Sequence, residues 1–242
     1  MNTLPGTTAR RRIYLMRHGH VDYLSRHVAA AGTINEVALT RRGQSQAEAA
    51  GSAFAHVAFD RAASSGFPRT RETAELVLSF QDKAPALETI PALIEIQNGK
   101  MQPAKSREEL IARMNEAFAN AGKPGTSHNN GGELYARAQE RAVSAIVKLL
   151  GEPGWHTMLI VAHEGINRLI LSWMTGAGLN AMGAFEQDTG CVNVLDFDMR
   201  SGEIARPLIK AVNLTPYNYL KHGMNLTSLE AIFERDVKDV PV

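Results

Sequence analysis

The chain has 242 residues, 44% of them hydrophobic, and its 26 Lys and Arg residues nearly balance its 25 Asp and Glu residues, for a net charge of +1. This is the composition of a globular protein, without the basic excess of proteins that bind nucleic acid or anionic membrane surfaces. Cys191 is the single cysteine, so an internal disulfide and a thiolate zinc site are excluded and a reducing, cytoplasmic location is expected.

The N-terminal third is predicted to contain two strand–helix units. Residues 1–11, including most of the arginine cluster 10–12, are expected to form a flexible lead in solvent. The apolar run 13–16 predicts a buried strand, which ends where the sequence Arg-His-Gly begins. Capping and periodicity rules then predict a helix over 40–56, a strand over 59–65 and a helix over 68–78.

The rest of the chain continues this alternation. A capping pattern at 106–109 and strong helical periodicity after Glu133 indicate two helices, separated by a polar, glycine-rich loop over 122–132. No stretch approaches the roughly 18 apolar residues of a membrane helix. The predicted elements are a strand over 86–90, helices over 106–121 and 133–150, a strand over 157–162, a helix to 174, strands over 191–197 and 204–212, and a short helix over 227–235.

Alternating strands and helices predict an α/β fold, a three-layer α/β/α sandwich with a mostly parallel central sheet. We expect one domain over 1–242, in which 94–132 form a cap over the site and 213–242 form a C-terminal tail. In such sheets ligands bind beyond the carboxyl ends of the strands. Three predicted strands end in polar residues, which we therefore expect to meet at one edge of the sheet.

The residues at these strand ends match what phosphoryl transfer needs. They are Arg17 and His18 after the first strand, Arg69 after the second and His163 after a later one. A neutral imidazole is a competent nucleophile near pH 7, and neighbouring guanidinium groups favour its neutral form. Arginine also grips phosphate with a planar fork that lysine lacks. We therefore expect a site for a small phosphorylated substrate, with no metal and no cofactor.

Several segments resemble, in chain order, those of the histidine phosphatase superfamily, in its phosphoglycerate mutase-like branch. The matching segments are LMRHG at 15–19, LTRRGQSQA at 39–47, 64–74 around Arg69, LIEIQNG at 93–99, 132–141 and IVAH at 160–163. The resemblance implies that His18 is phosphorylated, that Arg17 and Arg69 bind the phosphate, and that Glu95 donates and accepts the proton. It assigns His163 as the second histidine of the site.

The chain departs from the family pattern at four positions. Val21 and Leu24 stand where threonine and asparagine are expected, Leu134 replaces a serine, and Glu164 replaces the glycine after the second histidine. In the superfamily's other branch an acidic donor follows that histidine directly, so Glu164 is a second candidate acid. We favour Glu95, with Glu164 then a carboxylate at a helix N-terminus.

Three functions are compatible with this site. The favoured one is a phosphomonoester hydrolase that acts on a small phosphorylated metabolite through a phosphohistidine on His18. A phosphoglycerate-type mutase is the alternative, but only 68 positions separate Glu95 from His163 and the segment 97–105 has few basic residues. The third is an inactive binding protein on the same fold. The sequence fixes neither the substrate nor the oligomeric state, and a homo-oligomer is compatible with it.

Overall fold

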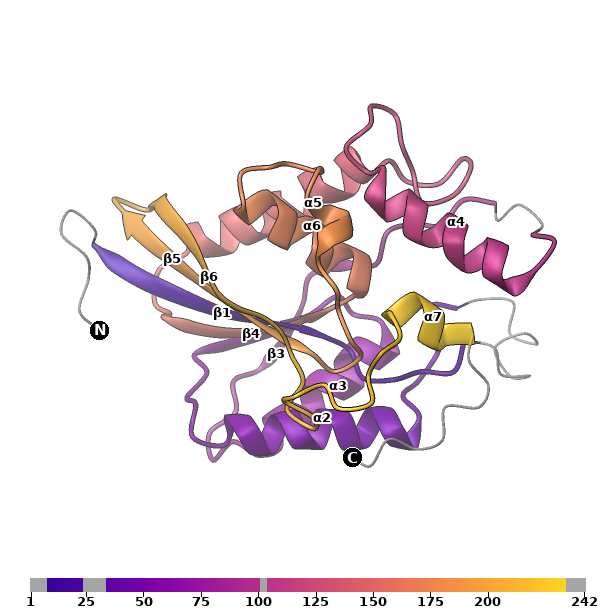
Figure 1. Cartoon of the computed structure of the whole chain (residues 1–242). Coiled ribbons are helices and arrows are strands. Elements are labelled where there is room, and N and C mark those ends of the chain that lie inside the picture. The colour runs from indigo at the N-terminus through magenta and orange to yellow at the C-terminus, as the bar shows by residue number, and fades with distance from the viewer. Residues whose placement is uncertain (1–7, 24–33, 101–103, 234–242) are drawn as a thin grey trace.

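A computed structural model describes residues 8–23, 34–100 and 104–233, and a mixed sheet crosses this part of the chain (Figure 1). The sheet has the strand order β3-β2-β4-β1-β5-β6, in which β3, β2, β4 and β1 run parallel and the β1–β5 and β5–β6 pairs are antiparallel. The predicted α/β class with a mostly parallel sheet is confirmed. The strands are β1 (Ala9–Arg17), β2 (Arg61–Ser64), β3 (Leu87–Thr89), β4 (Thr157–Ala162), β5 (Val192–Arg200) and β6 (Glu203–Leu214).

Helices cover both faces of the sheet, as the three-layer prediction requires (Figure 1). Helices α2 (Arg41–Phe54) and α3 (Pro68–Leu78) pack together below it, and α5 (Tyr135–Gly151) and α6 (Glu164–Met174) pack together above it. Helix α4 (Arg107–Ala119) contacts both the short 3₁₀ helix Met182–Ala184 and α7 (Ser228–Phe233). A second 3₁₀ helix covers Pro91–Leu93.

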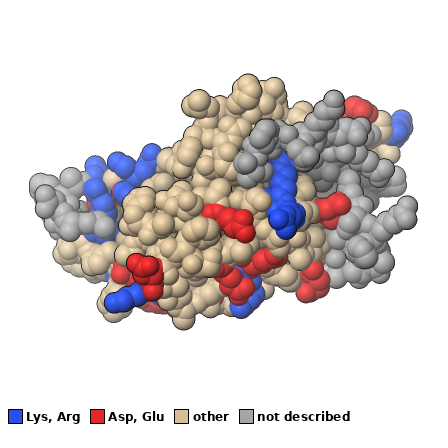
Figure 2. Space-filling view, turned by 90° about the horizontal axis from the view of Figure 1, so that it is seen from below, with Lys and Arg blue, Asp and Glu red and all other residues tan. Residues whose placement is uncertain are grey.

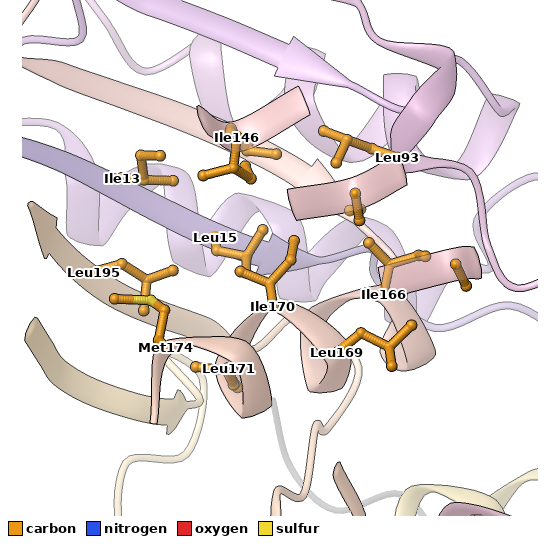
Figure 3. Close-up of a cluster of buried hydrophobic side chains, with 14 of the residues drawn as sticks. Ile13, Leu15, Leu93, Ile146, Ile166, Leu169, Ile170, Leu171, Met174 and Leu195 are labelled. Carbon is orange, nitrogen blue, oxygen red and sulfur yellow. The ribbon is translucent and has the colours of Figure 1, made fainter. Parts of the chain in front are cut away.

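Two hydrophobic clusters fill the spaces between these layers. Successive side chains of a strand point to opposite faces, so Ile13 and Leu15 of β1 join the cluster beneath α5 and α6, whereas Met16 joins the one against α2 and α3. Figure 3 shows Ile13 and Leu15 facing Ile170 and Ile146 in the first cluster, all of them inaccessible to solvent. This packing holds the carboxyl end of β1 rigidly in place.

The helices begin where their capping residues predicted. The hydroxyl of Thr40 accepts the Gly43 N–H at 3.2 Å and starts α2, and Pro68 occupies the first turn of α3. The Ser106 hydroxyl accepts the Glu109 N–H, also at 3.2 Å, and starts α4. The predicted strands and helices are thus found within a few residues of their expected bounds.

The flexible lead predicted over 1–11 is wrong for residues 9–11, which belong to β1. In the antiparallel register Arg10 stands opposite Asp198 and Arg12 opposite Asp196. The arginine Nε atoms lie 2.8 Å and 2.7 Å from those carboxylates. Arg10 and Arg12 extend the strand because their charges are paired across the sheet; residues 1–7 lie outside the described part.

Charged side chains are scattered over the face of the molecule seen from below. Figure 2 shows basic and acidic groups interspersed among uncharged surface, and no extended basic area interrupts the described residues on this face. Within the described ranges, no helix has the length and apolar character needed to cross a bilayer.

Candidate active site

Four of the predicted site residues meet at the carboxyl ends of three neighbouring strands. Arg17 ends β1 and His18 follows it, His163 follows β4, and Arg69 lies in the first turn of α3 after β2. Arg69 connects the two histidines, with Nε 3.3 Å from His18 Nε2 and Nη2 3.4 Å from His163 Nδ1. The two imidazole rings lie 5.4 Å apart, edge to face. All four side chains are at least 97% buried.

The tautomer of His18 follows from its neighbours. Its Nδ1 atom lies 2.7 Å from the carbonyl oxygen of Gly19, which can only accept, so Nδ1 carries the proton. The lone pair is therefore on Nε2, which faces Arg69 and lies 3.5 Å from the Tyr23 hydroxyl. Burial, together with Arg69 and Arg17, holds the pKa of His18 well below its usual value. The imidazole is thus neutral, with the unprotonated nitrogen toward the arginine.

A chain of hydroxyl groups fixes the orientation of His163. Thr70 donates its hydroxyl proton to the carbonyl of Phe67 at 2.8 Å and accepts from Ser65 at 3.0 Å. The Ser65 oxygen is then free to accept from Nε2 of His163 at 2.8 Å. Nδ1 of His163 consequently has the lone pair, on the side of Arg69. Burial first, and then Arg69, keep the pKa of His163 well below its usual value.

The guanidinium of Arg69 is held on several sides. Its Nη1 donates to the carbonyls of Ile34 and Asn35 at 3.1 Å and 3.2 Å. Its carbon lies 4.9 Å from the ring centre of Phe67 and 5.8 Å from that of Tyr23. Carbonyls and aromatic faces stabilise a cation, and these contacts hold the guanidinium group beside His18.

The Arg17 side chain is fixed through one terminal nitrogen. Its Nη1 contacts the carbonyl of Gln187 and lies 3.1 Å from a carboxylate oxygen of Glu164. Burial is the largest effect and lowers the pKa of Arg17, but Glu164 and smaller contributions from other neighbours together raise it by more, so the net shift is upward. The buried Nε atom has no hydrogen-bond partner among the described residues. A buried cationic donor of this kind is satisfied by an anion.

The loop after His18 rests on the N-terminus of α2. The His20 N–H donates to Gln46 at 2.8 Å, and Thr40 donates its N–H to the His20 carbonyl at 3.0 Å. A side-chain carbon on Gly19 would lie 2.3 Å from the Gly43 carbonyl oxygen, so the two backbones are in direct contact. The segment 39–47 therefore shapes the loop that carries His18.

Glu95 approaches the site from the segment after the 3₁₀ helix Pro91–Leu93. Its two carboxylate oxygens accept the N–H groups of Ile96 at 2.9 Å and Gly165 at 3.1 Å. Burial raises the pKa of Glu95 above its usual range, against the effect of these two hydrogen bonds. The raised pKa favours the protonated form that a general acid needs.

An ion pair fastens the segment that carries Glu95. Arg141 binds both oxygens of Glu133, at 2.7 Å and 2.8 Å, and donates to the carbonyls of Ala92 and Ile94 at 2.7 Å and 2.9 Å. Glu133 also accepts the Gln97 N–H at 3.0 Å. The segment 132–141, which resembles the family pattern, therefore holds in place the backbone that carries Glu95.

Glu164 has a different environment from Glu95. It is buried between two arginines, with one oxygen 3.1 Å from Arg17 and the other 2.9 Å from Arg168. The second oxygen also accepts the Ser228 hydroxyl at 2.6 Å. The oxygens of Glu164 are thus engaged by two guanidinium groups and a hydroxyl, whereas those of Glu95 accept from two backbone N–H groups.

The other departures from the family pattern do not supply polar groups to the site. Val21 is buried among Val37 and Leu39, and Leu134 is 40% exposed. Leu24 lies outside the described residues. Nowhere in the described ranges do three His, Cys, Asp or Glu side chains gather closely enough to hold a metal ion.

Sequence reasoning missed two contributors to the site, Gln187 and Ser228. Gln187 acts through its backbone carbonyl, for which no residue type is required, so no signal could have identified it. Ser228 lies inside the capping pattern at 227–230, which predicted a helix but not the contact with Glu164.

Comparison with known proteins identifies the family to which this site belongs. Residues 13–209 match the histidine phosphatase superfamily (branch 1). The chain belongs to this superfamily.

The relatives are phosphatases by name. An adenosylcobalamin/alpha-ribazole phosphatase of Escherichia coli is 28% identical over 196 residues, covering 78% of this chain and 91% of that protein. A 2-carboxy-D-arabinitol-1-phosphatase of Triticum aestivum is 26% identical over 221 residues, 88% of this chain and 42% of that protein. The alpha-ribazole phosphatase structure from Shigella flexneri has a TM-score of 0.62 and 25% identity, covering 84% of this chain and 96% of that one. The chain is a hydrolase of the histidine phosphatase type, and these matches leave its substrate open.

Proposed function

We propose that the chain hydrolyses the phosphomonoester of a small metabolite through a phosphohistidine on His18. The observation that carries the proposal is the position of the His18 Nε2 lone pair, 3.3 Å from the Nε donor of Arg69. A nucleophile and a cation that face the same point are what a phosphoryl group needs on its attacked side.

In the first step the His18 Nε2 lone pair attacks phosphorus and the bond to the leaving oxygen breaks. Arg69 and the unpartnered Nε of Arg17 donate to the phosphoryl oxygens, where charge increases. The leaving oxygen takes the proton of the Glu95 carboxyl group. Glu95 suits this step because burial raises its pKa while two backbone N–H groups hold its orientation.

The second step releases the phosphate. Water attacks the phosphorus, Glu95 takes its proton, and the P–N bond breaks to restore the His18 lone pair. His163 contacts Arg69 through its Nδ1 atom, 3.4 Å from Nη2, and so helps to hold that guanidinium group beside the phosphoryl oxygens in this proposal. The cycle consumes one water and leaves every protein group as it began.

The test is to trap the intermediate. Wild-type protein mixed rapidly with a ³²P-labelled aryl phosphate and quenched in alkali, in which phosphohistidine survives, should be labelled on His18. The His18→Ala variant should show neither label nor turnover, with its circular dichroism spectrum unchanged. Turnover near the wild-type rate in that variant would show that His18 is not the nucleophile.

A small phosphorylated metabolite is the substrate class that the relatives support, since they are named for phosphates of alpha-ribazole and of 2-carboxy-D-arabinitol. We propose that the described parts of the segment 94–132, which carry Glu95 and α4, cap the bound substrate; residues 101–103 of this segment lie outside the described residues. A panel of sugar, sugar-acid and nucleoside monophosphates, compared by kcat/KM, tests the class. A marked preference for phosphoproteins over the whole panel would contradict it.

A further inference from the structure

Glu164 lies at the centre of a buried polar network that includes Arg17, one of the proposed phosphate-binding residues. Its Oε1 atom accepts from Arg168 at 2.9 Å and from the Ser228 hydroxyl at 2.6 Å. Its Oε2 atom is thereby turned toward Arg17, 3.1 Å from Nη1. Each of these four side chains is less than 8% exposed. Water therefore contributes little to this arrangement, and the geometry depends on the direct contacts.

Ser228 brings the C-terminal segment into this network. It is the first residue of α7, whose start is fixed by reciprocal hydrogen bonds between Thr227 and Glu230, at 2.7 Å and 3.2 Å. The next side chain, Leu229, is 3% exposed and belongs to the main hydrophobic cluster. The hydroxyl of Ser228 thus has a defined position, set by a cap on one side and by packing on the other.

Ser228 also supports the second contact of Arg17. Its backbone N–H donates to Glu186 at 3.0 Å, and Arg168 binds the same carboxylate at 3.1 Å. Glu186 directly precedes Gln187, whose carbonyl accepts from Arg17 Nη1. Arg17 Nη1 thus has two acceptors, Glu164 and the Gln187 carbonyl. Ser228 and Arg168 bind Glu164 directly, and they hold Gln187 through its neighbour Glu186.

We propose that Glu164 and Ser228 are positioning residues, which aim the Arg17 fork at the phosphoryl group. The two contacts hold one terminal nitrogen and leave the buried Nε atom without a partner among the described residues, available to an anion. The arrangement gives a role to two features that the proposed reaction leaves unexplained. They are Glu164, the acidic residue after the second histidine, and the capped helix α7. It rests on the proposed function in that Arg17 binds phosphate.

The experiment measures the binding of inorganic phosphate by calorimetry, which needs no turnover, with kcat and KM for an aryl phosphate alongside. Ser228→Ala removes the hydroxyl, Ser228→Thr retains it, and Ser172→Ala is the matched control. Ser172 is a buried serine on α6 whose hydroxyl donates to the Gly178 carbonyl, away from the Glu164 network. Each variant is made in the wild-type and in the Arg17→Lys background, because a lysine has no planar fork to aim.

In the wild-type background Ser228→Ala should weaken phosphate binding about three- to tenfold, the range of one hydrogen bond. Ser228→Thr and Ser172→Ala should each stay within about twofold of wild type. In the Arg17→Lys background the effect of Ser228→Ala should vanish, because a positioning residue acts only through the group that it positions.

The proposal is overturned if Ser228→Ala binds phosphate like wild type. It is also overturned if the loss is equal in both backgrounds, or if Ser172→Ala causes the same loss. Should Ser228→Ala fail to fold, Glu164→Gln takes its place: it must weaken phosphate binding in the wild-type background and have no further effect in the Arg17→Lys background, and an equal loss in both backgrounds overturns the proposal. Absence of turnover with every phosphomonoester would refute the proposed function and leave this binding comparison standing.

Discussion

His18 Nδ1 lies 2.7 Å from the Gly19 carbonyl oxygen, and this contact assigns the imidazole proton to the nitrogen that faces away from Arg69. The Nε2 atom, which faces Arg69, is consequently unprotonated. Burial and two arginines also keep the ring from gaining a second proton. The chemistry of the site therefore depends on a buried histidine that stays neutral where a solvated one would titrate.

The first prediction concerns stability against pH. In the unfolded chain His18 takes up a proton near pH 6.5, whereas in the folded chain its pKa is well below that value. Above pH 6.5 His18 is neutral in both states and does not change the free energy of unfolding. As the pH decreases from 6.5 toward the folded pKa, the unfolded chain takes up the proton first, and the free energy of unfolding falls. The slope from one such group is at most about 1.4 kcal/mol per pH unit.

Urea titrations between pH 5 and pH 8 measure this slope. His18→Gln should flatten the acid limb by up to that amount and leave the region above pH 7 parallel to wild type. Glu95, whose pKa is raised, acts in the opposite direction but is present in both proteins. An unchanged acid limb in His18→Gln would mean that His18 takes up its proton in the folded state as readily as in water.

The second prediction concerns the arginine fork. Arg69→Lys keeps the charge but cannot donate at once to His18, His163 and the carbonyl of Ile34. We expect kcat to fall about 10²–10³-fold, the usual effect of losing one preorganised donor. Arg71→Lys on the same helix is the matched control, since Arg71 is exposed and pairs only with Glu75 among the contacts described. Equal activity of the two variants would place Arg69 outside the reaction.

The third prediction concerns the orientation of His163. Ser65→Ala removes the acceptor that holds the proton on Nε2 of His163. We expect kcat to fall about tenfold, the value of one net hydrogen bond at the upper end of its range, while KM changes little. Ser64→Ala is the control, because Ser64 is equally buried but accepts only the Gly66 N–H among the contacts described. A loss that is the same in both variants would indicate packing rather than orientation.

The strand ends were predictable because they combine a local signal with a general rule. Buried apolar runs that stop at His18 and at His163 mark strand ends in the sequence, and parallel strands bring such ends together. The register that makes Arg10 and Arg12 part of β1 was not predictable, since it depends on aspartates in β5 more than 180 residues away. From the sequence alone a cluster of charged side chains is predicted to lie in solvent, because its ion-pair partners elsewhere in the chain are not yet known.

Glu164 shows a second limit of the sequence. Its place after the second histidine left two roles open, and only the contacts with Arg17 and Arg168 favour one of them. Contacts through backbone carbonyls, such as that of Gln187 with Arg17, have no sequence signature at all.

The fourth prediction is that hydrolysis needs no metal ion. In the proposed mechanism Arg17 and Arg69 supply the positive charge around the phosphoryl oxygens that a divalent ion supplies in other phosphatases. Prolonged dialysis against a chelator should leave kcat/KM within about twofold of the untreated protein, the ordinary scatter of such measurements. Loss of activity that added Mg²⁺ or Mn²⁺ restores, with buffer controls unaffected, would show that a cation takes part.

The last prediction separates the two candidate acids. A leaving alcohol of high pKa must be protonated as it departs, whereas a nitrophenolate leaves without help. Glu95→Gln should therefore slow the hydrolysis of alkyl phosphates far more than that of a nitrophenyl phosphate. Glu164→Gln should slow both to a similar extent, because its loss disturbs Arg17, which both substrates need.

The measurement is kcat for a series of esters whose leaving groups span a range of pKa, with each variant plotted against wild type. A steeper dependence in Glu95→Gln alone assigns the proton to Glu95, in agreement with its raised pKa and its two backbone hydrogen bonds. A steeper dependence in Glu164→Gln alone would transfer the role to Glu164, against its ion pairs with two arginines. If neither variant changes the slope, the proton comes from His163 or from water, and Glu95 must act in orienting the substrate.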